Sequence, residues 1–212
     1  MSRTGGEKTK EKLVFLAFLL FSKKPYCEVI FKDLEELSGL TRGALLYHFK
    51  NKQELFNLVV EFSMLSRASI LEIPLKERDC LKNFLLDFLN KCEVTVKTMA
   101  SHGIKNVNLA HYNIENQALY YFENYDKLAK QMQKTELKVW EQAVKKAYQN
   151  KEIKQDIVPE KITSLLYYTY LGHAYSSAKE AKGCNMKLLK EELFYIYDMV
   201  KENSVIIREA GR

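Results

Sequence analysis

The chain has 212 residues and a mass of 24.8 kDa, which is enough for one large domain or two smaller ones with a packed core. Hydrophobic residues make up 47% and charged residues 28% of the sequence, so its composition excludes both a disordered chain and a polytopic membrane protein. The 33 basic and 27 acidic residues leave a formal net charge of +6, which allows contact with an anionic partner.

The apolar run from Leu13 to Phe21 follows several lysines and superficially resembles a secretory signal. Two acids, Glu7 and Glu11, interrupt the basic stretch, and nine residues are too few to span a bilayer. We therefore expect a buried first helix, no membrane partner and a cytoplasmic protein. Reduced thiols are expected because no Cys-x-x-Cys pair occurs among the four cysteines, Cys27, Cys80, Cys92 and Cys184.

Glycine and proline fall almost entirely at the tails or between periodic segments, which is typical of an all-α protein with short connections. Nothing alternates with a period of two residues, so no sheet is expected. A compact head of three short helices, residues 1–52, precedes a larger helical body, residues 53–212. The expected helices, about nine, cover residues 8–22, 31–37, 42–48, 52–73, 76–101, 106–115, 117–149, 160–182 and 186–207.

Residues 31–49 have the pattern of two short helices joined by a tight turn. The first helix ends at Gly39, Leu40 fills the turn, and the hydroxyl of Thr41 can cap the second helix. This pattern predicts a helix-turn-helix.

The second of these helices has two unlike faces. Leu45 and Phe49 point one way, whereas Gly43 and Tyr47 point almost opposite, which leaves the second face free for a DNA major groove. No acidic residue lies between Thr41 and Lys52 to repel a polyanion. The candidate DNA-binding residues are Thr41, Arg42, Gly43, Ala44, Leu46, Tyr47, His48, Lys50 and Lys52.

Lys52 stands in the first turn of the fourth expected helix, after the capping sequence Asn51-Lys-Gln-Glu54. A cation there opposes the helix dipole by about 0.3 to 1 kcal/mol unless an anion lies beside it. A DNA phosphate would relieve that conflict. The alternative is a solvated surface lysine.

These residues resemble the N-terminal signature of the TetR-like (TetR/AcrR) family of bacterial transcriptional regulators. The resemblance covers about residues 9–60, in order and at the right spacing. It is carried by Thr9-Lys-Glu-Lys-Leu13, Ala17, Leu20-Phe21, Lys24, Tyr26, Gly39-Leu40-Thr41-Arg42-Gly43, Leu45, Tyr47-His48-Phe49-Lys50, Lys52 and Glu54-Leu55. It implies a DNA-binding head and a C-terminal regulatory and dimerisation body.

Some positions depart from the family pattern. Ile30 stands where a threonine commonly caps the second helix and touches a phosphate, and Leu46 replaces an aromatic residue. Leu46 could instead meet a thymine methyl group. Phe15 and Leu19 give the first helix a second apolar face, which we expect to pack on the body rather than to form an exposed partner patch.

The resemblance also implies that the last two long helices pair with their twofold mates in a four-helix bundle. An intramolecular helix pair would explain the same apolar stripes. The candidate interface residues are Leu165, Thr169, Gly172, Ser176, Leu189, Leu193, Ile196, Tyr197 and Val200.

The middle of the chain is rich in aromatic residues, histidine and methionine, which would suit an apolar cavity edged with phenol hydroxyls. Plain core packing is the alternative. The candidate ligand-binding residues are Phe84, Phe88, Met99, His102, Tyr112, Tyr121, Tyr125, Trp140, Tyr168 and His173.

The expected function is a homodimeric repressor of a palindromic operator, released by a small apolar or aromatic effector. The alternative is a DNA-binding structural or partner-controlled protein that has no small effector. An enzyme, a metal site and a cofactor are not expected, because the four histidines are scattered and no zinc-binding or phosphate-binding motif occurs. An interfacial membrane anchor at Leu13 to Phe21 is disfavoured because the run lacks a charged face.

Overall fold

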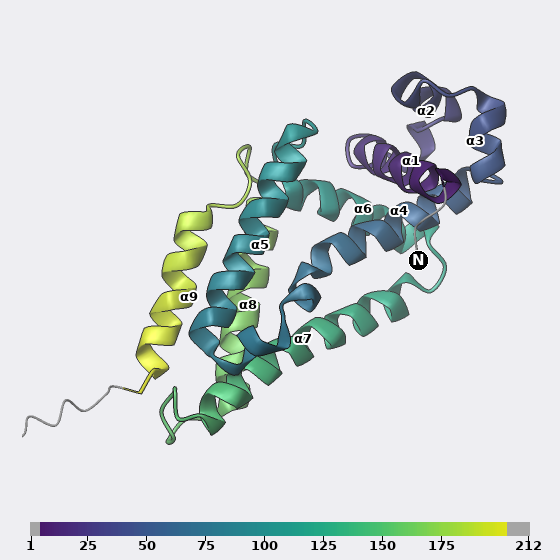
Figure 1. Cartoon of the computed structure of the whole chain (residues 1–212). Coiled ribbons are helices and arrows are strands. Elements are labelled where there is room, and N and C mark those ends of the chain that lie inside the picture. The colour runs from purple at the N-terminus through teal and green to yellow at the C-terminus, as the bar shows by residue number, and fades with distance from the viewer. Residues whose placement is uncertain (1–4, 203–212) are drawn as a thin grey trace, which may run out of the picture.

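The computed structural model describes residues 5–202, apart from the side chains of residues 65–69, and this part of the chain is all-α, as predicted (Figure 1). It has nine α-helices: α1 Gly5–Phe21, α2 Phe31–Ser38, α3 Arg42–His48, α4 Lys52–Arg67, α5 Leu81–Ser101, α6 Val107–Tyr121, α7 Tyr125–Gln149, α8 Pro159–Ser177 and α9 Met186–Val200. Three short 3-10 helices are η1 Tyr26–Glu28, η2 Ala68–Glu72 and η3 Leu75–Asp79.

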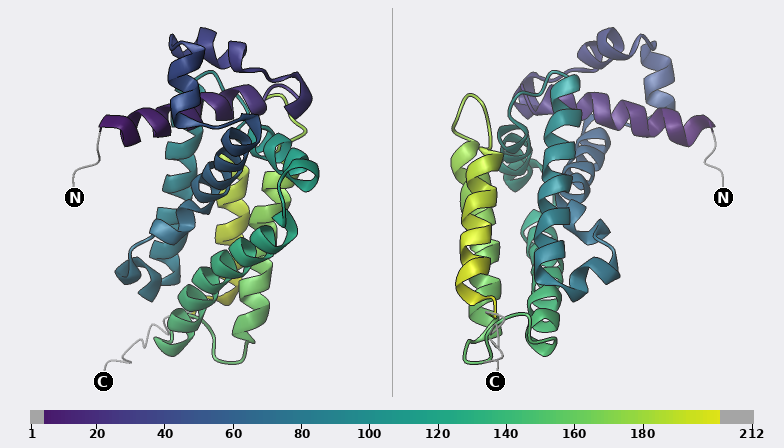
Figure 2. Two further views of the ribbon diagram at one scale, coloured as in Figure 1. Left: turned by 90° about the vertical axis from the view of Figure 1, so that its right-hand side faces the viewer. Right: turned by 60° about the vertical axis from the view of Figure 1, so that its left-hand side comes forward.

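Helices α1 to α3 form a head at one end of the molecule, and the longer helices α5, α7, α8 and α9 form the body (Figures 1 and 2). Helix α4 runs from the head into the body, and α6 lies at the junction between them (Figure 1). Across the described residues, no helix is both long enough and apolar enough to cross a membrane.

Buried apolar side chains gather in two clusters. The head cluster joins α1 to α4 with α6, where Phe18, Phe56 and Ile114 are fully buried. The body cluster joins α5, α7, α8 and α9 around Trp140, whose ring centre lies 5.0 Å from that of Phe84. Helix α6 therefore contributes its buried side chains to the head cluster, although it follows α5 of the body in the chain.

The predicted helices 52–73 and 76–101 are shorter than expected. An irregular segment of two 3-10 helices separates α4 from α5. The Arg78 guanidinium stabilises it by donating to the backbone oxygens of Leu71, at 2.9 Å, and of Ile73, at 3.0 Å. In a continuous helix these backbone oxygens would accept from the next turn, and here the Arg78 side chain supplies the hydrogen bonds instead. The apolar pattern of the sequence does not show such a contact.

Glu152, in the connection between α7 and α8, fixes the start of α5. Its carboxylate accepts hydrogen bonds from the backbone N–H groups of Leu81, at 2.8 Å, and Lys82, at 3.0 Å. The Tyr197 hydroxyl of α9 donates to the same carboxylate at 3.1 Å. One side chain thus caps α5 and holds α9 against it.

The predicted break between helices 106–115 and 117–149 is wrong. Helix α6 continues past it because Ile114 and Ala118, four residues apart, are both fully buried in the head cluster. The chain turns only at Asn124, whose φ of 59° is left-handed, a conformation that asparagine tolerates better than most residues.

Helix α8 ends at Ser177 instead of residue 182. The Asn106 side-chain amide donates to the backbone oxygens of Ser177 and Glu180, each at 2.7 Å, and so provides partners for carbonyl groups at and beyond the end of the helix. Helix α9 ends at Val200 rather than at the expected residue 207, and residues 203–207 of that prediction lie outside the described part of the chain.

Candidate nucleic-acid interface and effector cavity

Helix α3 is fixed in place by local contacts. Gly39 ends α2 in the left-handed conformation, with φ 72°, and the Thr41 hydroxyl then accepts a hydrogen bond from the Ala44 N–H at 3.4 Å. Leu45 and Phe49 are buried in the head cluster, so the inner face of α3 is anchored.

The outer face of α3 is bare, as predicted. Gly43 is exposed, Tyr47 is 84% exposed and Leu46 is 44% exposed. Arg42 is also exposed, and its guanidinium lies 5.9 Å from the centre of the Phe31 ring. Thr41 and Lys50 are exposed at the two ends of the face, and Ala44 and His48 are half-buried at its flanks. Figure 1 shows α3 at the outer edge of the head, away from the body.

The start of α4 is capped by Asn51, as the sequence predicts, although the Glu54 side chain bonds to Lys50 and not to the cap residue itself. The Asn51 side-chain oxygen accepts from the Glu54 N–H at 2.8 Å, and the Glu54 carboxylate accepts from the Lys50 N–H at 2.8 Å. The reciprocal pair fixes the backbone at Lys50 while its ammonium group stays exposed.

Lys52 does not stand as an unengaged cation at the helix start, and this part of the prediction needs correction. Its ammonium group donates to the backbone oxygens of Tyr26, at 2.9 Å, and Val29, at 3.1 Å, and lies 4.4 Å from the centre of the Tyr26 ring. Carbonyl oxygens and a ring face, rather than a phosphate, therefore surround much of this charge. The partners come from η1 and from the residue that follows it.

Ile30 has no side-chain acceptor to cap α2, and Asp33 instead bonds back to the Ile30 backbone. The Asp33 carboxylate accepts from the Ile30 N–H at 2.8 Å and pairs with the Lys24 ammonium at 2.8 Å. The hydrogen bond from the Ile30 N–H, followed by that from Lys24, holds the pKa of Asp33 below its usual value. The start of α2 is thus held by Asp33, although no side chain at position 30 caps its first N–H groups.

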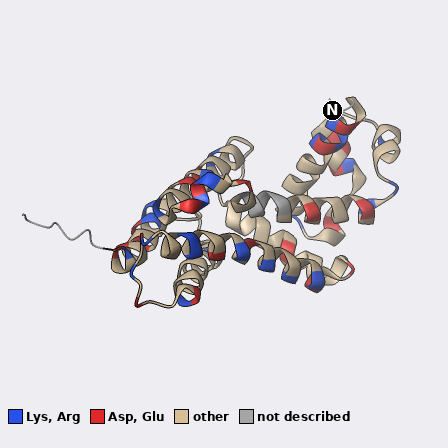
Figure 3. Ribbon diagram, turned by 60° about the horizontal axis from the view of Figure 1, so that its bottom comes forward, with Lys and Arg blue, Asp and Glu red and all other residues tan. Residues whose placement is uncertain are grey.

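Positive charge is spread over the molecule rather than concentrated in the head. Lysines recur along the exposed side of α7, as the blue segments in Figure 3 show: Lys127, Lys130, Lys134, Lys138 and Lys145. The stretch from Thr41 to Lys50, which includes the outer face of α3, contains no carboxylate residue that would repel a polyanion.

Polar side chains of α6 hold the head to the body, and sequence analysis did not identify them. The Asn113 amide donates to the Ser22 backbone oxygen at 2.9 Å, and the Gln117 amide donates to the Phe21 backbone oxygen at 3.0 Å. Both acceptors lie at the C-terminal end of α1, where backbone oxygens have no partner within the helix. The sequence signal for this contact was the presence of asparagine and glutamine on an otherwise apolar face of the helix.

Aromatic contacts extend this junction. The ring of Tyr121, at the end of α6, stacks on that of Tyr26 with centres 4.3 Å apart. Phe15 of α1 packs edge-on against Phe62 of α4, at 6.0 Å, and His102 beyond the end of α5, at 4.7 Å. The second apolar face predicted for the first helix therefore packs on the rest of the protein.

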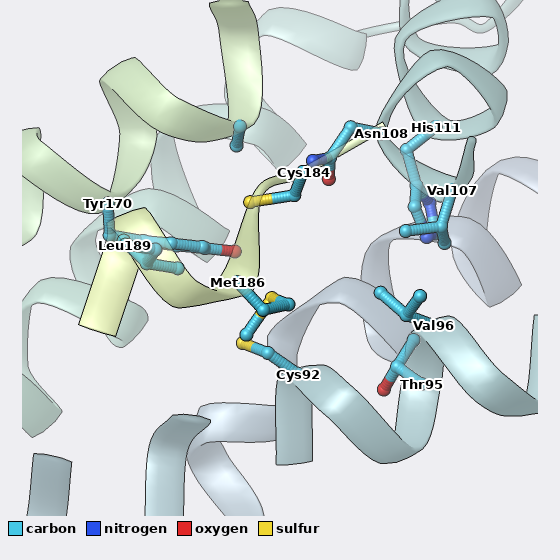
Figure 4. Close-up of a pocket in the computed structure, with 11 residues that line it drawn as sticks. Cys92, Thr95, Val96, Val107, Asn108, His111, Tyr170, Cys184, Met186 and Leu189 are labelled. Carbon is cyan, nitrogen blue, oxygen red and sulfur yellow. The ribbon is translucent and has the colours of Figure 1, made fainter. Parts of the chain in front are cut away.

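A narrow cavity of about 50 Å³ lies among α5, α6, α8 and the start of α9 (Figure 4). Its lining is apolar and sulfur-rich with a few polar atoms, and comprises Cys92, Thr95, Val96, Val107, Asn108, His111, Tyr170, Ala174, Cys184, Met186 and Leu189. Burial raises the pKa of the Cys92 thiol to about 12, so this group is uncharged at neutral pH.

None of the ten predicted ligand-binding residues belongs to this lining. Four of them pack in the two clusters, because aromatic stripes at helical spacing also serve as core: Phe84, Phe88, Met99 and Trp140. His102 and Tyr121 lie at the head junction, and Tyr168 is exposed on α8. His173 lies 2.7 Å from the Glu192 carboxylate, between α8 and α9.

The other two predicted residues line separate openings. Tyr112 lines one of about 230 Å³ that also includes Asn108, His111 and Ala174 of the narrow cavity. Tyr125 lines a third opening, of about 330 Å³, among α4, α6, α7 and α8. His111 was missed as a lining residue because its environment depends on helices far apart in sequence.

The α9 half of the predicted dimer interface is wrong. Its five residues are buried within the protomer, in the body cluster: Leu189, Leu193, Ile196, Tyr197 and Val200. The intramolecular alternative therefore explains this stripe. On α8, Leu165, Gly172 and Ser176 are exposed and Thr169 is half-buried, so these four remain available to a partner.

Within residues 5–202, no group of three or more histidine, cysteine, aspartate or glutamate side chains could hold a metal ion. All four cysteines are free thiols, and only Cys27 is fully exposed. Sequence spacing predicted neither a metal site nor a disulfide.

Comparison with known proteins gives a family match for the head of the molecule. The sequence profile of bacterial regulatory proteins, tetR family, matches residues 16–59, from α1 into α4. A probable HTH-type transcriptional regulator, ArpR of Pseudomonas putida, is 30% identical over 97 residues, 43% of this chain and 46% of its own length. A probable acrEF/envCD operon repressor of Escherichia coli (strain K12) is 34% identical over 50 residues, 24% of this chain and 23% of its own length. The chain thus spans less than half the length of either relative.

The whole fold also has counterparts of known structure. The crystal structure of a TetR-family transcriptional regulator from Cytophaga hutchinsonii superposes with a TM-score of 0.63 at 18% identity, and the match covers 96% of this chain and all of that one. The profile match falls on the helix-turn-helix, and the structural likeness extends over head and body together. Residues 16–59 of the chain thus match the tetR family of bacterial regulatory proteins.

Proposed function

We propose that the protein is a transcriptional regulator that binds double-stranded DNA through the outer face of α3. The observation that carries the proposal is the contrast between the two faces of this helix: Leu45 and Phe49 are buried, whereas Gly43 and Tyr47 are exposed. A helix anchored on one side and bare on the other can enter a major groove without unpacking the head.

The residues of this face suit distinct parts of a duplex. Gly43 lets the backbone approach base edges, the Arg42 guanidinium can bond to guanine or phosphate, and the Tyr47 hydroxyl can bond to a base. Leu46 supplies an apolar surface for a thymine methyl group. Lys50 is exposed and supplies a phosphate contact, while Lys52 contributes chiefly by fixing the start of α4.

Specific binding by such a head calls for two copies, because one short helix makes too few base contacts to stand out among genomic sites. We assign dimerisation to the exposed faces of α8 and α9, which lie side by side in the body (Figure 2). Tyr168 on α8 and Tyr195 and Met199 on α9 are large side chains exposed by 56%, 67% and 45%. They join the exposed α8 residues Leu165, Gly172 and Ser176 and replace the buried α9 stripe in this assignment.

The division of labour follows from this arrangement. Residues 1–52 bind DNA, and residues 53–212 hold the dimer and respond to a small apolar or aromatic effector. A repressor is favoured because a relative that matches part of the chain is named a probable operon repressor. Two heads related by a twofold axis would bind a palindrome with half-sites about one helical turn apart, or a multiple of that.

Selection of bound duplexes from a random DNA pool tests the proposal. A palindrome is expected, and Arg42→Ala and Tyr47→Ala should each weaken binding by about 1 to 3 kcal/mol for each hydrogen bond to a base that the variant can no longer make. Tyr120→Ala is the matched control, because it removes an 83% exposed tyrosine of α6 that belongs neither to α3 nor to the assigned dimer face. Selection of no common sequence would contradict the proposal.

A further inference from the structure

We propose that the lysines on the exposed side of α7 bind the phosphate backbone of a second DNA duplex, different from the one that α3 binds. This row, the α7 stripe, consists of Lys127, Lys130, Lys134, Lys138 and Lys145. The inference goes beyond the proposed function, because it assigns a DNA contact to the body of the protein. It rests on that function only for the choice of DNA as the polyanion.

The stripe follows from the spacing of its lysines along one helix. Successive members are three, four or seven residues apart, so they fall within an arc of about 80° and extend over about 27 Å of α7. Trp140 and Ala143, on the opposite side of the helix, are fully buried in the body cluster. The body therefore holds α7 by its apolar side and leaves the stripe on the surface.

Most of the charge of the stripe is not neutralised by neighbouring side chains. Lys130 forms an ion pair with Asp126 across 3.8 Å, and both side chains are largely exposed. Among the described residues, the other four lysines form no ion pair. One carboxylate residue, Glu141, falls within the same arc. Five lysines against one glutamate leave a surface that attracts a polyanion.

The surroundings of the stripe favour a nucleic-acid backbone over a protein or a membrane. Along the whole of α7, which lies within the described residues, no large apolar side chain is exposed. Protein interfaces depend on aromatic and arginine anchors, and lysine is depleted in them. A helix that lies on a membrane inserts its apolar face, and that face of α7 is buried in the body cluster. Lysines without such anchors suit phosphates, whose binding depends on charge rather than on sequence.

The stripe and the outer face of α3 lie on different parts of the molecule. Figure 1 shows the head with α3 at the top, whereas Figure 3, in which the bottom of the molecule comes forward, shows the stripe. The stripe thus faces away from a duplex bound by the head. A duplex carries one negative charge per about 1.7 Å of its axis, so a length equal to that of the stripe presents about sixteen charges. The lysines can therefore meet phosphates in any register.

Binding of a second duplex is measured on the immobilised full chain with its heads already occupied. The protein is saturated with the unlabelled selected operator and then titrated with a labelled duplex that lacks the palindrome. The stripe variant replaces four lysines with glutamine, which has a similar helix propensity: Lys127→Gln, Lys134→Gln, Lys138→Gln and Lys145→Gln.

The control variant removes the same number of positive charges from exposed lysines outside α7. It carries Lys82→Gln, Lys105→Gln, Lys182→Gln and Lys190→Gln. We expect the wild type and the control to bind the labelled duplex with a salt dependence of about three to four units from the four lysines, and the stripe variant to bind at least about tenfold more weakly. Operator affinity and thermal unfolding of the stripe variant should stay close to those of the wild type.

The outcomes separate the two proposals. Absence of labelled-duplex binding by the wild type, or equally tight binding by the stripe and control variants, would overturn the inference and leave the proposed function intact. Stripe-dependent binding to vesicles of phosphatidylserine and phosphatidylcholine in place of the duplex would also overturn it, because the stripe would then belong to a lipid surface. If no operator is selected, the proposed function fails, and the same comparison without operator still decides whether α7 binds DNA.

Discussion

The head cluster and the body cluster differ in what holds their helices together. In the body, aromatic rings close around Trp140, with the Phe88 ring centre at 4.9 Å. The head cluster has close ring contacts too, but its α6 is also held to the end of α1 by side-chain amides on backbone oxygens, as with Asn113 and Gln117. Close-packed rings cannot shift without a large cost in packing energy, whereas single hydrogen bonds can be remade. The comparison indicates that the ends of α1 and α6 can adjust against each other more readily than the body helices can around Trp140.

The largest expected effect comes from breaking the body cluster. Phe84→Ala removes a fully buried ring that packs against Trp140 and should lower the free energy of unfolding by about 3 to 5 kcal/mol. Chemical denaturation monitored by circular dichroism measures it. Tyr120→Ala, at an 83% exposed position, should change it by less than about 0.5 kcal/mol. Similar losses for both variants would contradict a packed body.

Glu152 offers the next largest effect. Glu152→Gln keeps the size of the side chain but replaces the carboxylate that caps α5 and accepts from Tyr197 with a neutral amide. We therefore expect a loss of about 1.5 to 3 kcal/mol in the free energy of unfolding. The control is Glu160→Gln, an exposed residue in the first turn of α8. Chemical denaturation measures this loss as well. Equal stability of the two variants would contradict the role of Glu152 as the link between α5 and α9.

Lys50 and Lys52 sharpen the distinction between DNA binding and head stability. Lys52→Met removes two hydrogen bonds to backbone oxygens and should destabilise the head by about 1 to 2 kcal/mol. Lys50→Met should leave stability unchanged but flatten the salt dependence of operator binding by about one unit per subunit. Thermal unfolding and salt titrations separate the two results. The opposite pattern would return Lys52 to the role of phosphate anchor.

The smallest effect concerns pH. The pKa of Asp33 is lowered in the folded head, so its stabilisation is complete above the ordinary carboxyl value of 3.8 and is lost as the pH falls through the lower folded value. The expected loss is below about 1 kcal/mol because the pair is near the surface. Asp33→Asn should remove this part of the acid dependence. An unchanged acid unfolding curve for the variant would show that the Asp33 carboxylate does not hold the Ile30 N–H and Lys24 in solution.

How far sequence alone predicts this protein depends on how local the contacts are. The two faces of α3 follow from residues within one short helix, whose ends are set by Gly39 and Thr41. The apolar stripe of α9 is equally clear in the sequence, yet the same pattern fits a partner subunit or the protein's own α5 and α8. Only the packing shows that Leu193 is buried within the protomer.

The narrow cavity was beyond sequence analysis for a related reason. Aromatic composition cannot separate a lined cavity from a filled core, because the difference depends on which helices leave space between them. Trp140 and Phe88 fill their space completely, whereas His111 lies at a wall between two openings. Lys52 shows the same limit, since its partners Tyr26 and Val29 lie more than twenty residues away.

The most direct test of the central claim is photo-crosslinking from single positions to the selected duplex. A photoreactive phenylalanine analogue would replace Tyr47 on α3 or Tyr195 on α9, two exposed tyrosines on different parts of the molecule. We predict a DNA crosslink from position 47 that maps to a half-site of the palindrome, and none from position 195. Crosslinking from 195 with none from 47 would contradict recognition by the outer face of α3.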